Sequence, residues 1–206
     1  TGLAEFYDNA CANVSYYYDY VDSMGLLPNM TGSEWWHIPD HPYHSVNTAG
    51  TYSTVCNLLL YDSLNHLSMI ADILGKMEDA AAWQVKADSL EASINANLLD
   101  HETGLYVDSY GVADSNPGVT AMAINFGVAP TLLREQQIEY LTTATFETKV
   151  VLTWELFHAI MTYGNAQQKE MVYNQILTTW GQMINAGDST IWEGFTDVES
   201  HSHAWT

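Results

Sequence analysis

Apolar residues recur every three or four positions along most of this chain, a spacing that predicts amphipathic helices. The first row of them covers residues 7–24 and stops at Gly25, and glycine is a common helix terminator. Two further rows cover residues 60–74, which Gly75 ends, and residues 83–98. Because only a few residues join those two rows, we expect two antiparallel helices packed side by side.

The second half of the chain continues this pattern in shorter segments. We predict a small apolar helix over residues 118–127, closed by Pro130, and another helix over about residues 132–144. The last two helices are predicted from rows made of Val150, Trp154, Phe157 and Met161, and of Val172, Ile176, Trp180 and Met183. We expect Trp154 to be a core residue, and its neighbour Glu155 to face the open end of the helical assembly.

No segment alternates apolar and polar residues for long enough to predict a sheet strand, although residues 100–108 are expected to form a turn and a short extended piece. Every clear element is therefore helical, and short connections alternate with long loops. This arrangement is typical of stacked helical hairpins whose long loops gather at one end and build a pocket. We favour a closed ring of hairpins over a solenoid, because the sequence has no fixed repeat period.

The residues with the most distinctive chemistry lie between positions 187 and 205. A glycine turn is followed by Trp192 and Glu193, and a polar loop ends in two histidines, one of them His203, and Trp205. Indole rings stack on the C–H faces of sugars, and a carboxylate can move a proton at the anomeric carbon. Trp192 or Trp205 taken alone is more simply interpreted as a core residue, but the combination favours a sugar site.

The charge of the chain excludes some partners. Its 206 residues include 25 Asp plus Glu and only 5 Lys plus Arg, which gives a formal net charge of −20. Such a surface repels nucleic acid phosphates and anionic lipids, and no apolar run reaches membrane-spanning length. We therefore expect neither a nucleic acid nor a membrane as a partner.

Two glycosylation acceptor sequences, at Asn13 and Asn29, and the low lysine content favour an exported, extracellular glycoprotein. Cys11 and Cys56 either form a disulfide or are both buried thiols. Two cysteines alone do not decide the compartment.

The loop that follows the first predicted helix is rich in histidine. His37, His41 and His44, together with Asp40, are residue types that bind zinc. Their irregular spacing matches no known zinc site, so we expect no metal and interpret them as surface or hydrogen-bonding residues. The sequence also has no glycine-rich loop that could hold phosphates, and no cofactor is expected.

Four stretches carry a family resemblance: residues 57–108, which include DHETGLYVD, then AMAINFGVAP at 121–130, GDSTIWEGF at 187–195 and SHSHAW at 200–205. They resemble the catalytic domain of inverting α-L-rhamnosidases of bacteria and fungi, over roughly residues 50–206. That domain is an (α/α)6 barrel of twelve helices. The resemblance implies an all-α fold in which this chain, residues 1–206, forms a partial barrel of about seven helices, from the C-terminal part of the domain.

The resemblance also implies roles for single residues. Glu193 corresponds to the catalytic base, and His203 corresponds to a histidine that contacts the bound sugar. Trp36, with Trp35 as the alternative, corresponds to an aromatic wall of the pocket. The substrate-binding residues expected in this way are Trp35, Trp36, Trp192, His203 and Trp205.

An inverting hydrolysis needs two carboxyl groups about 6.5–9.5 Å apart: an acid that protonates the leaving oxygen and a base that activates water. The resemblance implies that the acid lies upstream, near an arginine, in a segment that we do not find here, since Arg134 is the only arginine. We therefore expect the remaining part of the same polypeptide as a partner, and a carbohydrate with terminal α-L-rhamnose as substrate. Residues 1–206 alone are expected to be inactive.

Two other functions stay open. The chain could belong to another (α/α)6-barrel carbohydrate-active enzyme with a different sugar specificity, including a polysaccharide lyase. A lyase uses basic residues to neutralise uronates, and the shortage of Lys and Arg argues against it. The chain could also be a non-catalytic carbohydrate-binding module, which would be favoured if the full-length protein lacked the acid.

Overall fold

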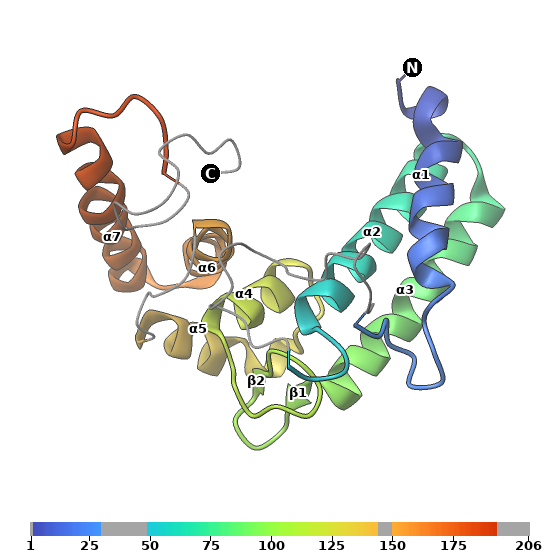
Figure 1. Cartoon of the computed structure of the whole chain (residues 1–206), viewed down its shortest axis with the longest axis horizontal. Helices are drawn as coiled ribbons and strands as arrows, with labels where there is room; N and C mark the ends of the chain where they lie inside the picture. The colour runs from blue at the N-terminus through green and yellow to red at the C-terminus, as the bar shows by residue number, and fades with distance from the viewer. Residues whose placement is uncertain (1, 30–48, 144–149, 193–206) are drawn as a thin grey trace. The chain divides into compact units, whose positions relative to one another are not determined.

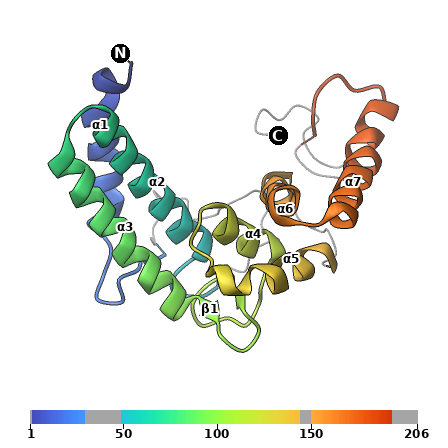
Figure 2. The same ribbon diagram turned by 180° about the vertical axis from the view of Figure 1, so that it is seen from behind.

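The computed structural model describes residues 2–29, 49–143 and 150–192. They divide into two compact units, one made of residues 2–29 and 49–114 and the other of residues 115–143 and 150–192. The described part contains seven α-helices, one turn of 3₁₀ helix and one short β-hairpin (Figures 1 and 2). The predicted all-α fold class is therefore confirmed.

The first unit is built on three helices: α1 (Gly2–Tyr18), α2 (Thr54–Ile73) and α3 (Met77–Asn97). α2 and α3 lie antiparallel and side by side in both views, which confirms the predicted helical hairpin (Figures 1 and 2). Gly75 reverses the chain between them with a φ of +75°, a left-handed conformation that glycine adopts without strain. The buried positions have the predicted spacing and are Leu60, Leu64, Leu67 and Ala71 on α2, and Trp83, Ala87, Leu90 and Ile94 on α3.

α1 is shorter than predicted, because it ends at Tyr18 and residues 19–25 form turns instead of continuing the helix. Asp22 organises this reversal. Its backbone N–H donates to the carbonyl of Leu26 at 3.2 Å, and its carboxylate accepts from the N–H of Met24 at 2.8 Å. An aspartate whose side chain binds nearby backbone N–H groups competes with helical hydrogen bonding. The helix therefore ends before the row of apolar residues does.

Two asparagines fix the segment after α1 to the start of α2. The buried side chain of Asn57 accepts from the N–H of Leu27 at 2.8 Å and donates to the carbonyl of Leu27 at 3.0 Å. Asn29 donates through Nδ2 to the carbonyl of Gly50 at 2.7 Å, and its Oδ1 accepts from the N–H of Ser53 at 2.8 Å. Ser53 is the N-cap of α2, so these bonds define where that helix begins.

The hairpin consists of β1 (Leu99–Asp100) and β2 (Leu105–Tyr106), which pair antiparallel. It confirms the turn and short extended piece predicted for this region. Asp100 closes the turn, since its Oδ1 accepts from the N–H of Glu102 and its Oδ2 accepts from the hydroxyl of Thr103, both at 2.8 Å. The backbone donor of Glu102, and then the hydroxyl of Thr103, lower the pKa of Asp100.

The second unit contains α4 (Pro117–Asn125), the 3₁₀ turn η1 (Thr131–Leu133), α5 (Arg134–Thr143), α6 (Val150–Tyr163) and α7 (Ala166–Asn185). These elements match the predicted helices of the second half to within a few residues. α4 and α6 approach closely because Gly118 has no side chain. A Cβ atom at position 118 would lie only 2.7 Å from the Cβ of Leu152.

The inward face of α6 differs from the prediction. Trp154 is 64% exposed and Met161 is 48% exposed, so Trp154 is not a core residue. The buried side of α6 is formed instead by Leu152, Leu156, Ala159 and Ile160, together with Phe157. Since α6 is apolar on nearly every side, two of its faces show helical spacing, and the sequence does not tell which of them is buried.

No disulfide joins Cys11 and Cys56; both thiols are half-buried, and burial raises the pKa of the Cys56 thiol. Within the ranges that the structure describes, no helix combines the length and the apolar character needed to cross a bilayer.

Candidate active site

The predicted sugar-site segment begins at the end of α7. The N–H of Gly187 donates to the carbonyl of Ile184 at 3.0 Å, and the N–H of Asp188 donates to the carbonyl of Met183 at 3.2 Å. Gly187 adopts a φ of +86°, as a residue that terminates a helix in the left-handed conformation does. The predicted glycine turn is thus confirmed, and it redirects the chain at the start of the segment that carries Trp192.

Trp192 is a buried residue of the second unit. Its side chain is 5% exposed, and its Nε1–H donates to Oδ2 of Asp188 at 2.7 Å. A buried indole N–H needs an acceptor, and a carboxylate is a strong one because its charge strengthens the hydrogen bond. This environment agrees with the simpler interpretation of Trp192 as a core residue, and its contact with a sugar stays a prediction.

The other predicted site residues lie outside the described part of the chain. They are Glu193, Trp35, Trp36, His203 and Trp205, and the histidine-rich loop with His37, Asp40, His41 and His44 lies outside it as well. Their roles therefore stay predictions, and Trp192 is the predicted site residue whose surroundings can be described.

The second unit also contains a polar contact, between Asn125 and Glu155, that the sequence did not predict. Nδ2 of Asn125, at the end of α4, donates to Oε2 of Glu155 at 2.6 Å and to the carbonyl of the same residue at 2.8 Å. Oδ1 of Asn125 is buried without a hydrogen-bond partner. On α6, the rings of Trp154 and His158 stack with centroids 6.0 Å apart. The sequence indicated Glu155 as a polar residue of interest, but Asn125 stands within an apolar row and gave no signal.

The DHETGLYVD motif belongs to the first unit, and its described contacts are structural. Asp100 binds only donors of its own turn in the hydrogen bonds described above. Tyr106 is fully buried and its hydroxyl donates to Oδ1 of Asn95 on α3. Burial, followed by the negative charge of Glu91, raises the pKa of Tyr106.

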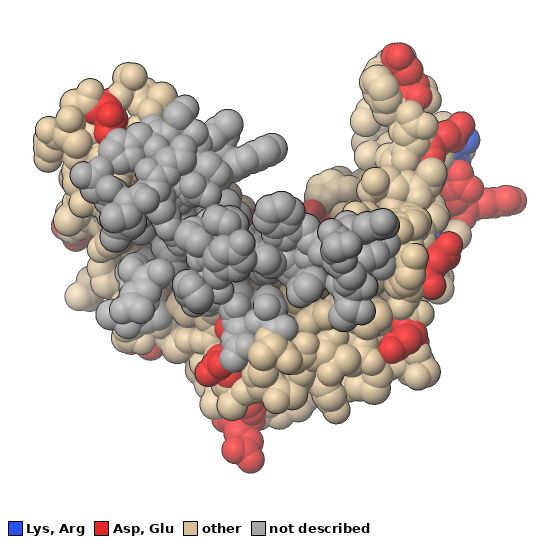
Figure 3. Space-filling view, viewed as in Figure 1, with Lys and Arg blue, Asp and Glu red and all other residues tan. Residues whose placement is uncertain are grey.

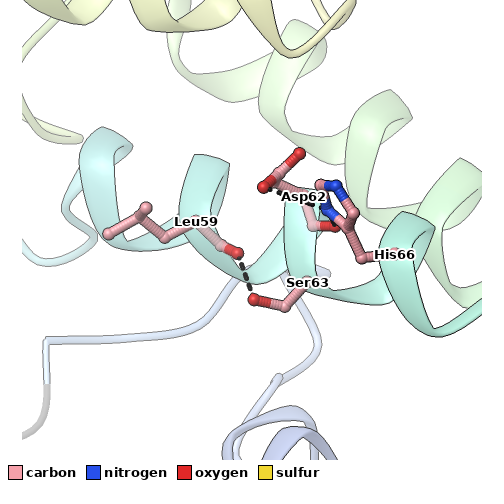
Figure 4. A network of polar contacts seen from close by, with 4 residues as sticks. All are labelled: Leu59, Asp62, Ser63 and His66. Carbon is pink, nitrogen blue, oxygen red and sulfur yellow. Dashed lines mark hydrogen bonds and ion pairs between the residues drawn. The ribbon is translucent and has the colours of Figure 1, made fainter. Parts of the chain in front are cut away.

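A histidine–aspartate pair lies on the surface of α2 (Figure 4). Nδ1 of His66 is 2.9 Å from the carbonyl oxygen of Asp62 and 3.2 Å from its Oδ2, and the hydroxyl of Ser63 donates to the carbonyl of Leu59 at 2.7 Å. Burial raises the pKa of Asp62, and the charge and hydrogen bond of His66 partly oppose this effect. All these contacts stay within neighbouring turns of one helix, so the pair is a local helix-surface interaction.

The single arginine of the sequence stacks on an aromatic ring within the second unit. The guanidinium carbon of Arg134 lies 4.2 Å from the centre of the Tyr163 ring. On the face of the molecule shown in Figure 3, Asp and Glu side chains clearly outnumber Lys and Arg, as the net charge of −20 requires. Such a surface is poorly suited to polyanionic ligands.

The class of protein follows from the comparison with known families: it is that of the hairpin-built glycosidase domains. Residues 2–206 match the family described as the bacterial alpha-L-rhamnosidase six-hairpin glycosidase domain, and the chain belongs to this family. The predicted family resemblance is thereby confirmed. The chain is a glycoside hydrolase-like domain of the rhamnosidase type.

Solved structures show the same fold. The GH78 family rhamnosidase of Bacillus sp. GL1 is similar with a TM-score of 0.79 and 24% identity over 98% of this chain. A rhamnosidase from Klebsiella oxytoca with rhamnose bound gives 0.74 and 18% over 98% of the chain, and the alpha-L-rhamnosidase from Dictyoglumus thermophilum gives 0.72 and 18% over 98%. The chain spans 22%, 40% and 23% of those three proteins, respectively. Among curated proteins, none matches the sequence.

Proposed function

We propose that the protein containing this chain hydrolyses terminal α-L-rhamnosides, in glycosides or polysaccharides, with inversion at the anomeric carbon. The family match over residues 2–206 is the observation that carries this proposal. The rhamnose bound in the Klebsiella oxytoca relative supports the choice of sugar.

Glu193 is the general base in this proposal. It activates a water molecule on the face of the sugar opposite the leaving oxygen, and a second carboxyl group, about 6.5–9.5 Å away, protonates that oxygen. Trp192, which directly precedes Glu193 in the sequence, is buried, and a large aromatic side chain beside the base is in keeping with a sugar site. The proposed sugar contacts are Trp192, Trp205, His203 and the aromatic pair Trp35 and Trp36.

The remaining part of the same polypeptide supplies the general acid and the other helices of the barrel. Two observations support this. The chain spans only 22% to 40% of the similar solved proteins. On α7, Tyr173, Leu177 and Ile184 share one side of the helix and are 59%, 56% and 74% exposed. An exposed apolar row of this kind is typical of a surface that another part of a protein covers.

A direct test of this incompleteness uses purified residues 1–206. We expect no rhamnoside turnover, because one of the two carboxyl groups is missing, and we expect binding of the dye ANS to the apolar row. Rhamnoside turnover by residues 1–206 would refute the proposal that the acid lies elsewhere.

Export of the protein is a further part of the proposal. Its support is the pair of acceptor sequences, and of their asparagines Asn13 is exposed on α1. Asn29 uses its Nδ2 to bind the carbonyl of Gly50, so a glycan there would remove a structural hydrogen bond. Mass spectrometry of the protein from its natural source should find it in the extracellular fraction and, if it is glycosylated, with the glycan on Asn13. Recovery from the cell interior alone would contradict export.

The role of Glu193 is tested by kinetics of the full-length protein on an aryl α-L-rhamnoside. Glu193→Gln removes the base and should lower kcat by about 10²–10⁴-fold, the usual effect of losing a general base. Glu170→Gln, which makes the same change at an exposed position of α7, is the matched control and should keep full activity.

The same assay separates the alternatives. Full activity of Glu193→Gln would contradict the assignment of the base. If the unmodified full-length protein binds rhamnose without turnover, it is a carbohydrate-binding module, and if it hydrolyses only other glycosides, it is a related enzyme with a different sugar specificity.

A further inference from the structure

One face of α6 carries an exposed aromatic ring beside polar side chains. Trp154 is 64% exposed, its ring stacks on that of the exposed His158, and Glu155 follows it in the chain. We propose that Trp154, Glu155 and His158, called the Trp154 face below, bind a neutral sugar residue of the carbohydrate ligand, other than the residue that is cleaved. The choice of rhamnose as that sugar rests on the proposed function, whereas the binding face itself goes beyond it.

Helical geometry brings the three side chains to one part of the surface. Residues three and four positions apart are neighbours on a helix, so His158 lies next to both Trp154 and Glu155. The indole and imidazole rings have centroids 6.0 Å apart and planes inclined by 23°, which gives the indole a defined orientation. Because Trp154 stays mostly open to solvent, its ring is accessible to the C–H face of a pyranose.

The carboxylate of Glu155 is held in place from a second helix. α4 and α6 lie side by side in both views (Figures 1 and 2), and Nδ2 of Asn125 on α4 donates to Oε2 of Glu155 at 2.6 Å and to its carbonyl oxygen at 2.8 Å. No contact among the described residues involves Oε1 of Glu155, so this oxygen can accept from a sugar hydroxyl.

The polar group around Glu155 also needs a further donor. Oδ1 of Asn125 is buried without a hydrogen-bond partner. Buried polar atoms rarely stay unpaired, so we expect a donor from outside the described residues to complete this group. A hydroxyl of a bound sugar is such a donor.

The chemistry of the Trp154 face favours a neutral polar ligand. A chain with a net charge of −20 repels anions. An apolar protein surface would bury Glu155 and His158 without giving them hydrogen bonds, which costs free energy. A pyranose has both an apolar C–H face for the indole and hydroxyl groups for the polar side chains. The competing ligand is a cation, since an indole and a carboxylate attract one as well.

Binding of a neutral polymer of α-linked L-rhamnose to the full-length protein tests the proposal, and affinity electrophoresis measures the Kd. We expect Trp154→Ala to raise the Kd by about 10–100-fold, because an aromatic anchor carries much of the binding free energy. Trp154→Phe keeps a ring and should stay within about 5-fold. Phe6→Ala removes a ring of similar exposure, 60%, from α1 and is the matched control, with a Kd within about 2-fold of the unmodified protein.

Two further measurements separate a sugar from a cation. Glu155→Gln keeps an oxygen that accepts from a hydroxyl but removes the charge, so the Kd for the polymer should change by less than about 5-fold. Raising sodium chloride from about 50 to about 500 mM should change it by less than about 2-fold, because the polymer is neutral. If tetramethylammonium binds through Trp154 and the polymer does not, the ligand is a cation and the proposal is overturned.

Kinetics keep this inference apart from the proposed function. Trp154→Ala should leave kcat and KM for a small aryl α-L-rhamnoside within about 3-fold, and should raise KM for the polymer by about 10-fold at nearly unchanged kcat. A loss of more than about 10-fold in kcat/KM on the aryl rhamnoside would place Trp154 at the cleaved sugar and overturn the proposal.

The two proposals can fail separately. If the unmodified protein does not hydrolyse the aryl rhamnoside but binds the polymer through Trp154, the proposed function is wrong and the Trp154 face is supported. If the polymer does not bind, or if Trp154→Ala binds it with the Kd of the unmodified protein, the Trp154 face is overturned, whatever the protein hydrolyses.

Discussion

Single residues show where the sequence is informative and where it is not. Trp192 stands out in the sequence because few residue types combine an aromatic face with a hydrogen-bond donor. Its partner Asp188 does not, since an aspartate after a glycine turn is an ordinary loop residue. The bond between them depends on the path that the backbone takes after α7, and no spacing rule encodes that path.

Asn57 illustrates the same limit within the core. It interrupts an otherwise apolar row in α2, yet it is fully buried. Its side chain binds both backbone polar groups of Leu27 and donates to the carbonyl of Ser53 at 2.8 Å. Leu27 lies outside any helix or strand, so its buried backbone N–H and carbonyl need partners from a side chain, and Asn57 provides them.

We predict that Asn57→Leu destabilises the fold by about 2–4 kcal/mol, because it leaves the N–H and the carbonyl of Leu27 buried without their present partner. Urea denaturation measures this change. Asn65→Leu, on a less buried position of the same helix, is the control and should cost less than about 1 kcal/mol. Equal effects of the two substitutions would contradict the role assigned to Asn57.

At the scale of elements, hydrophobic periodicity predicted the helices but not all of their ends and faces. The α2–α3 hairpin matches the prediction because both helices have one clear apolar row. α1 ends early because Asp22 binds the backbone of its own turn. α6 presents Trp154 outward because the helix is apolar on nearly every side, and its neighbours in the fold select the buried face.

The hairpin after α3 predicts a defined dependence of stability on pH. The pKa of Asp100 is lowered from its ordinary value of 3.8 by the donors of its turn. A carboxyl group with a lowered pKa stabilises the folded state above its ordinary pKa, and this stabilisation is lost as the pH falls through the folded-state value. Asp100→Asn should therefore lower the free energy of unfolding at about pH 7. The difference in this free energy between the variant and the unmodified protein should shrink as the pH falls below about 4.

Urea denaturation at several pH values checks this prediction. Glu102→Gln removes a charge from the same turn but leaves the side-chain bonds of Asp100 in place, so it controls for net charge. A difference between Asp100→Asn and the unmodified protein that stays constant from about pH 7 to about pH 2 would contradict the role of the carboxylate.

At the scale of the whole molecule, the fold class and the family could be predicted from local patterns. Helical spacing gave the all-α class, and the DSTIWEGF and SHSHAW motifs gave the family. The assembly of the site could not be derived in this way. Which loops meet at a pocket depends on contacts between residues that are distant in the sequence, and periodicity contains no information on them.

The stereochemistry of the reaction tests the central claim most directly. Proton NMR of the full-length protein acting on an aryl α-L-rhamnoside identifies the anomer of rhamnose that is released first, before the two anomers equilibrate in water. An inverting mechanism, in which Glu193 activates water, predicts β-L-rhamnose as the first product. Release of α-L-rhamnose first would show a retaining mechanism, and it would contradict the role of Glu193 as a base that acts on water.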